Sequence, residues 1–289
     1  MRSRRPARDP IDQILALDLG GRGIAGFFVA GGAARAADAL RRARRVVIVT
    51  GFAVAPGTAE TDGPPGAAVL GRALRRLGAR VRYIVDPPAV APLRAALRAL
   101  GEPDDVAVYV GGDESARAVL TLERPTHLVA IERPGRTARG DYLNARGRSV
   151  AAWNARLDGL FLVRGARRPV TVGVGDGGNE IGMGNVRARI AGQGRLAARI
   201  ASVVRVDHLV VAGTSNWGAY GIVAALARAT RRPLLHTAAD EARMVRACAR
   251  AGAVDGITRR REATVDGLPR ETHAAVLDLL RIAAARAVE

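Results

Sequence analysis

Short aliphatic runs alternate with helix-length segments along most of this sequence. The runs are rich in Val, Ile, Leu and Ala, and most are followed by about ten or more residues with helical patterning. Strands separated by crossover helices form a parallel sheet that is covered on both faces. We therefore predict an α/β fold, a three-layer sandwich with a mostly parallel, Rossmann-like sheet and helices on both faces. The expected strands are residues 46–50, 81–85, 106–110, 127–131, 170–174 and 208–212, with 233–236 as a further short one.

The chain has 289 residues, enough for one large α/β domain or two small ones. No stretch has the composition of a linker that would force a domain boundary. We expect residues 1–10 to form a basic flexible arm and residues 11–289 to form a single α/β catalytic domain. The polar segment 136–149 is the candidate lid. The expected helices are residues 10–19, 33–43, 67–77, 90–100, 114–122, 150–157, 186–191, 219–228, 239–251 and 270–287.

Arginine supplies all of the basic charge. The sequence has 45 basic and 27 acidic residues, a net charge of +18, and it contains no lysine. We interpret this as a codon bias, because the arginines are spread over predicted helix faces instead of forming one stripe. Aromatic residues make up only 3%, which argues against a stacking platform for single strands. We therefore expect no specific nucleic-acid partner.

The absence of lysine also excludes several kinds of chemistry. Schiff-base catalysis, the internal aldimine of pyridoxal phosphate and the Walker A phosphate loop all require a lysine. We therefore expect no pyridoxal phosphate (PLP).

The sequence gives no signal for secretion or membrane insertion. Its single cysteine, Cys248, cannot form an internal disulfide, which fits a reducing compartment. The basic start is not followed by an apolar segment, and no run approaches the roughly 18 apolar residues of a membrane span. We expect a cytoplasmic protein that does not bind membranes.

One stretch, residues 172–185, is unusually rich in glycine. Six glycines fall between Gly173 and Gly184, directly after a predicted strand, and they alternate with side chains that offer oxygen atoms. It matches a Gly-x-Gly-x-x-Gly pattern, but Asp176 and Glu180 would repel a pyrophosphate, so we expect no NAD. Carboxylate and amide oxygens favour Mn²⁺, Mg²⁺ or a substrate ammonium group. The four side chains are Asp176, Asn179, Glu180 and Asn185.

Polar residues follow four of the predicted strands. Ligands of open parallel sheets bind beyond the carboxyl ends of the strands, so these segments can converge on one pocket for a small molecule. Each has a structural alternative: a Pro-Pro turn with an aspartate bonded to its own backbone, a surface ion pair, or capping of the next helix. Besides the glycine-rich stretch, the segments are Glu60-Thr61-Asp62, Glu132-Arg133 and Thr214-Ser215-Asn216.

Several motifs together resemble the D-glutamate cyclase C-terminal domain family. The similarity runs from about Asp18 to His273, and the glycine-rich string is its most specific part. The resemblance implies conversion of D-glutamate to 5-oxo-D-proline with loss of water. In eukaryotic members the domain is joined to a second, hydro-lyase-like domain, so we expect either a separate hydro-lyase-like partner protein or a homo-oligomer. The other motifs are residues 60–67, 132–135, 144–147, 215–218 and 252–256.

The chemistry of cyclisation suggests roles for these residues. The α-amine must lose a proton and attack the γ-carboxyl carbon, which must itself be activated. We predict Asp176, Glu180 and Asn179 as catalytic, with Asp176 or Glu180 as the general base. A divalent cation would bind Asp176, Glu180 and Asp62. The predicted substrate-binding residues are Glu60, Thr61, Asp62, Arg133, Arg146, Asn185, Ser215 and Asn216, with Arg133 and then Arg146 as the clamp for the α-carboxylate.

Two other functions remain open at this point. An enzyme of the same fold could act on another small carboxylate or on a phosphorylated metabolite. A non-catalytic protein could bind such a ligand without turning it over.

Overall fold

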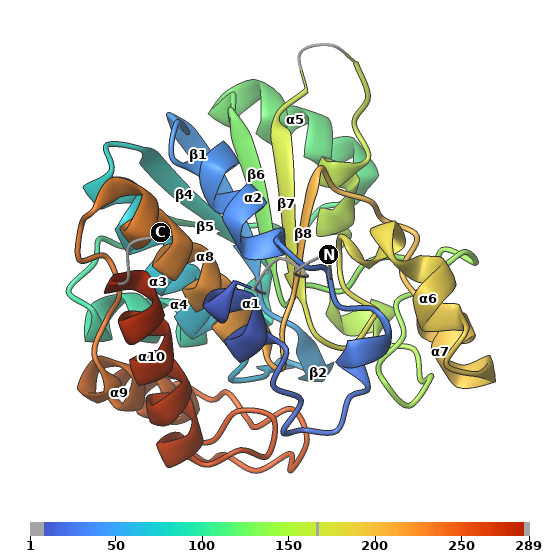
Figure 1. Ribbon diagram of the computed structural model, residues 1–289. Helices are drawn as coiled ribbons and strands as arrows, with labels where there is room; N and C mark the ends of the chain where they lie inside the picture. The colour runs from blue at the N-terminus through green and yellow to red at the C-terminus, as the bar shows by residue number, and fades with distance from the viewer. Residues whose placement is uncertain (1–8, 166–167, 286–289) are drawn as a thin grey trace, which may run out of the picture.

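The computed structural model describes residues 9–165 and 168–285 and confirms the α/β fold (Figure 1). Within those residues, six parallel strands form one sheet in the order β5-β4-β1-β6-β7-β8. The order reverses between β1 and β6, and ligands of such sheets bind at this reversal. A separate hairpin, β2–β3, follows β1. The strands are β1 (Arg45–Thr50), β2 (Ala53–Ala55), β3 (Thr58–Ala59), β4 (Arg80–Val85), β5 (Val106–Val108), β6 (His127–Ile131), β7 (Val170–Gly175) and β8 (His208–Val211).

Helices cover both faces of the sheet. The α-helices are α1 (Pro10–Leu15), α2 (Gly32–Leu40), α3 (Pro64–Arg76), α4 (Pro87–Ala99), α5 (Asp113–Glu123), α6 (Arg187–Ala191), α7 (Arg195–Ile200), α8 (Ser215–Thr230), α9 (Ala238–Arg250) and α10 (Arg270–Ala285). The 3₁₀ turns are η1 (Ile24–Gly26), η2 (Ala151–Trp153), η3 (Leu157–Phe161) and η4 (Met183–Asn185).

Alternate residues of each strand enter two different hydrophobic cores. Val46 and Ile48 of β1 lie in a core with α1–α4 and α8–α10, whereas Val47 and Val49 lie in a core with η1, α5, η3 and α6. Successive side chains of a strand point to opposite faces, so a strand buried on both faces must be apolar throughout. This explains the continuous aliphatic runs of the sequence.

A few segments differ from the sequence-based expectation. Residues 233–236 are not a strand: Arg231, directly after the end of α8, is left-handed, and Pro233 has no N–H to donate. Residues 150–157 form parts of the two turns η2 and η3 instead of one helix. Residues 1–8 of the expected arm lie outside the described residues. Asp9, within the same expected arm, caps α1, which begins at Pro10.

In the part of the chain that the structure describes, no helix is both long and apolar enough to cross a membrane.

Candidate functional site

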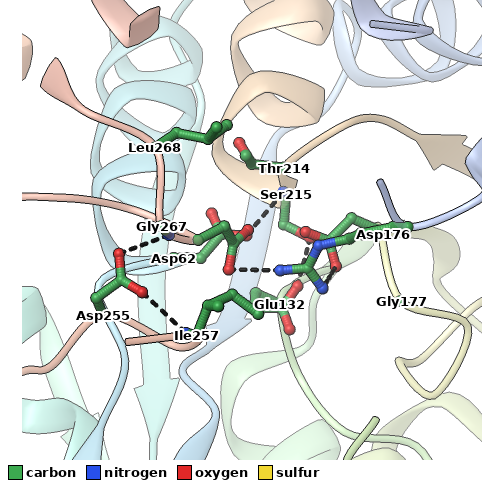
Figure 2. A network of polar contacts seen from close by, with 12 residues as sticks. Asp62, Glu132, Asp176, Gly177, Thr214, Ser215, Asp255, Ile257, Gly267 and Leu268 are labelled. Atoms are coloured by element: carbon green, nitrogen blue, oxygen red, sulfur yellow. Dashed lines mark hydrogen bonds and ion pairs between the residues drawn. The ribbon is translucent and has the colours of Figure 1, made fainter. Parts of the chain in front are cut away.

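Five buried carboxyl groups gather beyond the carboxyl ends of the central strands. We call this set the acidic cluster; it consists of Glu60, Asp62, Glu132, Asp176 and Asp266. Glu132 directly follows β6 and Asp176 directly follows β7, on neighbouring parallel strands. Figure 2 shows Asp62, Glu132 and Asp176 directed toward one region beside Ser215. The four segments predicted to converge therefore do so; the fourth of them is the start of α8.

Asp62 lies at the amino terminus of α8. Its Oδ2 accepts the N–H of Ser215 and its Oδ1 accepts the N–H of Asn216, both at 2.8 Å. A helix amino terminus favours a negative charge. Burial and the neighbouring Asp266 outweigh this effect and raise the pKa of Asp62 to about 8. At neutral pH and without a bound cation, the Asp62 carboxyl group therefore retains a proton for much of the time.

Glu132 holds a strained position in the centre of the site. Its φ is +45°, which is unusual for a residue other than glycine. Its Oε2 accepts a hydrogen bond from the Ser215 hydroxyl at 2.6 Å. Burial, with the charges of Glu180 and Glu60 nearby, raises the pKa of Glu132 well above its usual range. A carboxyl group with a raised pKa is a stronger base than an ordinary glutamate, which suits it to proton transfer.

Glu60 also has a strongly raised pKa, caused by burial and by the charges of Asp266 and Asp62. Its carboxyl group lies against Gly256, where an added Cβ would come within 2.2 Å of Glu60 Oε2. Glycine at this position therefore makes the space that the Glu60 side chain occupies.

Arg22 is the cation paired with the acidic cluster. Its Nη1 lies 3.1 Å from Asp176 Oδ1 and its Nη2 lies 2.5 Å from Asp266 Oδ1. Burial disfavours its charge, but the carboxylates of Asp176 and Asp266 raise its pKa well above the ordinary value. Burial also raises the pKa of Asp176, against the opposing effect of Arg22. The Oδ2 atoms of Asp176 and Asp266 are buried, and neither has a hydrogen-bond partner among the described residues.

Glu180 and Asn179 hold the backbone of the glycine-rich loop. The Glu180 carboxylate accepts three backbone N–H groups, from Asp176 at 3.2 Å, Gly177 at 2.6 Å and Gly178 at 2.8 Å. Asn179 Nδ2 donates to Leu143 O at 2.7 Å and so connects this loop to the candidate lid. These four hydrogen bonds all join parts of the protein to one another. The catalytic roles predicted for Glu180 and Asn179 stay predictions.

Two other predicted asparagines also bind backbone groups. Asn185 bonds both the N–H and the C=O of Val206, at 3.1 and 2.8 Å. Asn216 Oδ1 accepts the N–H groups of Gly63 at 3.0 Å and Gly66 at 2.8 Å, at the start of α3. These contacts tie neighbouring loops together, and the substrate-binding roles predicted for the two side chains stay predictions. The Thr61 hydroxyl serves in the same way and donates to Thr264 O at 2.7 Å.

The structure does not bring the two predicted carboxylate clamps into the acidic cluster. Arg133 is fully buried, and its guanidinium donates to Gly51 O at 2.8 Å and Ala155 O at 2.6 Å and pairs with Asp86 at 2.7 Å. It therefore joins three separate loops. Arg146 is exposed, and its backbone N–H bonds to Asn144 within the candidate lid.

The acidic cluster can hold a divalent cation. Among the described residues, carboxylate oxygens of Asp62, Asp176 and Asp266 lie within 4.8 Å of one another, and so do those of Glu132, Asp176 and Glu180. The first set fits a cation better, because Asp176 and Asp266 each have an unpartnered buried oxygen, whereas Glu180 already accepts three N–H groups. Carboxylate oxygens are the ligands that Mg²⁺ and Mn²⁺ prefer. The predicted metal ligands Asp62, Asp176 and Glu180 stay predictions, and Asp266 joins them as a candidate ligand.

Sequence reasoning missed Arg22 and Asp266. They lie before the first strand of the sheet and after its last strand, and the folded chain brings them together. Each is a charged residue next to glycine, in Gly20-Gly21-Arg22-Gly23 and in Asp266-Gly267. That pattern is the only local signal, and it is a weak one.

Comparisons with known proteins identify relatives of the chain. A family model described as D-glutamate cyclase-like, C-terminal matches residues 11–281. The human protein named D-glutamate cyclase, mitochondrial is 36% identical over 233 residues. That match covers 75% of this chain and 38% of the human protein, so the chain corresponds to well under half of its relative.

Solved structures with similar folds are much more distant. An exopolyphosphatase-related protein from Bacteroides fragilis is 11% identical, with a TM-score of 0.42 over 86% of this chain and 56% of that chain. An exonuclease RecJ bound to manganese is 14% identical, with a TM-score of 0.38 over 75% of this chain and 42% of that one. These similarities concern the α/β architecture alone.

Proposed function

This chain belongs to the D-glutamate cyclase-like family, and on that premise we propose that it is a lyase that converts D-glutamate to 5-oxo-D-proline with loss of water. The observation that carries the proposal is the buried acidic cluster paired with Arg22 at the point where the strand order reverses. Such a site offers negative groups for an ammonium or a metal cation and a positive group for a carboxylate. An amino acid has both kinds of charge.

The reaction requires proton transfer more than any other chemistry. The substrate nitrogen forms a bond to the γ-carbon and gives up two protons, and one γ-carboxylate oxygen leaves with those two protons as water. A group that first accepts and then donates a proton can therefore serve the whole reaction. Glu132 suits this role because its pKa is raised and its carboxyl group already bonds the Ser215 hydroxyl.

Asp62, Asp176 and Asp266 would hold the divalent cation. When bound, Mn²⁺ or Mg²⁺ would supply Lewis-acid polarisation of the γ-carboxylate, which is otherwise a poor electrophile. The same carboxyl groups, when ionised, would attract the substrate ammonium group. We keep Asp176 as the predicted alternative base, because its Oδ2 has no hydrogen-bond partner among the described residues.

Arg22 replaces Arg133 and Arg146 as the proposed partner of the substrate α-carboxylate. It is the only guanidinium with a described ion pair to the acidic cluster, and its side chain is 18% exposed. Arg259 adds positive charge nearby, since it lowers the pKa of Glu60 against the effect of burial. Its loop, residues 255–267, is organised by the Asp255 carboxylate, which accepts the N–H groups of Ile257 and Gly267 (Figure 2) and also that of Thr258.

The length of the relative motivates a second proposal. Because the matched region is only 38% of the human protein, turnover could require a separate hydro-lyase-like partner protein. In that case the isolated chain would bind D-glutamate and a divalent cation without releasing product.

The test is to incubate the purified protein with D- or L-glutamate in Mn²⁺, Mg²⁺ or EDTA, and to measure 5-oxoproline by chiral chromatography. We expect product from D-glutamate that depends on the cation. Glu132→Gln should lower kcat by about 100-fold or more, whereas Arg98→Gln on the outer surface of α4 should leave it unchanged. Binding without turnover would favour the second proposal. If the protein neither binds D-glutamate nor converts it to product, both proposals are contradicted.

A further inference from the structure

The guanidinium of Arg22 binds two of the carboxylates that fit a divalent cation. Two of its nitrogens approach Asp176 Oδ1 and Asp266 Oδ1 at 3.1 and 2.5 Å. The same two residues, with Asp62, form the set of carboxylates that best fits a divalent cation. Arg22 contacts the Oδ1 atoms, and a metal ion on the unpartnered Oδ2 atoms would share the same two carboxylates with it. Two cations this close repel each other strongly, so they compete for the same two carboxylates.

Arg22 also covers the access to this position. The side chains of Asp176 and Asp266 are 1% and 2% exposed, whereas that of Arg22 is 18% exposed. Among these three side chains, only the arginine has substantial contact with solvent. Arg22 is therefore the solvent-facing member of this group.

The loop that carries Arg22 allows its side chain to move while the backbone stays in place. Asp18 accepts the backbone N–H groups of Arg22 at 2.7 Å, Gly23 at 2.7 Å and Ile24 at 3.2 Å. The loop is therefore fixed through its backbone, independently of the guanidinium. Gly177 is a neighbour without a side chain, and even an added Cβ there would lie 3.5 Å from Arg22 Nη1. The Arg22 side chain can therefore move without a change in the hydrogen bonds that hold its backbone.

We propose that Arg22 is an internal cation that occupies the metal position of the acidic cluster and exchanges with a divalent cation. In the metal-free protein the guanidinium offsets part of the charge of Asp176 and Asp266. When the divalent cation binds, the guanidinium rotates toward the mouth of the site, where it can bind an anionic group of the substrate. Arg22 is thus a positioning residue that links loading of the metal to binding of the substrate carboxylate. This inference rests on the cation site of the proposed function.

The exchange predicts an unusual effect of mutation. If Arg22 competes with the metal, Arg22→Gln should tighten Mn²⁺ binding by about tenfold, because the ion no longer has to displace a bound cation. The metal-free variant should be less stable than the metal-free wild type, because Asp176 and Asp266 lose their counter-charge. Arg22→Lys should have an intermediate affinity, since an ammonium group is a point charge and cannot bridge two carboxylates as a planar guanidinium does.

The experiment is isothermal titration calorimetry of the full chain with Mn²⁺, without substrate. Arg98→Gln, which removes the same charge from the surface of α4, is the matched control and should keep the affinity of the wild type. A second measurement adds millimolar guanidinium chloride, which should compete with Mn²⁺ in Arg22→Gln and have little effect in the wild type.

Unchanged or weaker Mn²⁺ binding by Arg22→Gln would overturn the exchange, and so would a lack of competition by guanidinium. The titration does not depend on turnover. If no 5-oxoproline forms, the proposed reaction is contradicted, but the exchange of Arg22 with a divalent cation is still tested by the Mn²⁺ affinities.

Discussion

Replacing Asp266 with asparagine should remove most of the thermal stabilisation that Mn²⁺ gives to the protein. Asp266 contributes a buried oxygen without a hydrogen-bond partner among the described residues, and its carboxylate lies within ligand distance of Asp62 and Asp176. Asparagine keeps the shape of the side chain and tolerates the backbone φ of +55° at this position. The substitution therefore removes one charged ligand with little change in packing.

The size of the effect follows from ligand linkage. A ligand at 100 times its Kd that binds only the folded state adds about 2.7 kcal/mol. One kcal/mol raises the Tm of a domain of about this size by about 2–4 °C, so the wild type should gain about 5–11 °C. Loss of a carboxylate ligand should weaken binding at least as much as loss of a supporting partner, about 100-fold. At the same Mn²⁺ concentration the gain then falls to about 0.4 kcal/mol, or about 1–2 °C.

The assay is differential scanning calorimetry at neutral pH with and without Mn²⁺. The shift in Tm is compared within each protein, so that a change in the stability of the metal-free variant does not confuse the result. Asp38→Asn on α2, an exposed carboxylate paired with Arg41, is the matched control and should keep the full shift. A full shift in Asp266→Asn, or no shift in the wild type, would refute the assignment of the cation to these carboxylates.

Three further predictions concern other parts of the structure. The pKa of Asp62 rises from 3.8 to about 8 on folding, so its contribution to stability is complete below about pH 4 and is lost as the pH rises through about 8. In EDTA, the Tm of the wild type should therefore fall across this pH range more steeply than the Tm of Asp62→Asn. Equal slopes would contradict the raised pKa. Arg133→Met should lower the free energy of unfolding in urea by about 3–5 kcal/mol because it leaves Asp86 unpaired. KM for D-glutamate should not change. A raised KM with normal stability would instead support Arg133 as the residue that binds the substrate α-carboxylate. Asn216→Ala should cost about 2 kcal/mol in the same urea titration, because the Gly66 N–H at the start of α3 loses its acceptor and the Gly63 N–H keeps only Asp62 Oδ1. A loss under about 0.5 kcal/mol would show that the cap is unimportant.

The sheet and the place of the site could be predicted because both follow from local patterns. A run buried on both faces is apolar throughout, which made the central strands recognisable. Since parallel strands end at the same edge, the residues after them had to meet there. The sequence pattern alone therefore predicts that Asp62, Glu132, Asp176 and Ser215 lie together.

Which polar residues face a ligand and which bind the protein backbone could not be predicted in the same way. A carboxylate or amide in a glycine-rich loop looks the same in sequence whether it binds a ligand or the N–H groups of its own loop. Glu180 binds N–H groups of its own loop, and Asn216 binds those at the start of α3. Arg22 and Asp266 were missed because one precedes the first strand and the other follows the last. Their contact depends on the tertiary fold, and no local sequence pattern predicts it.

The central claim is that the acidic cluster is a cation site in which Arg22 stands in for the metal. Anomalous diffraction at the manganese edge, from crystals of the protein grown with Mn²⁺, tests it most directly. The account predicts an anomalous peak bonded to carboxylate oxygens of Asp62, Asp176 and Asp266, with the Arg22 guanidinium turned away from them. A peak elsewhere, or no peak while Arg22 still bridges Asp176 and Asp266, would contradict it.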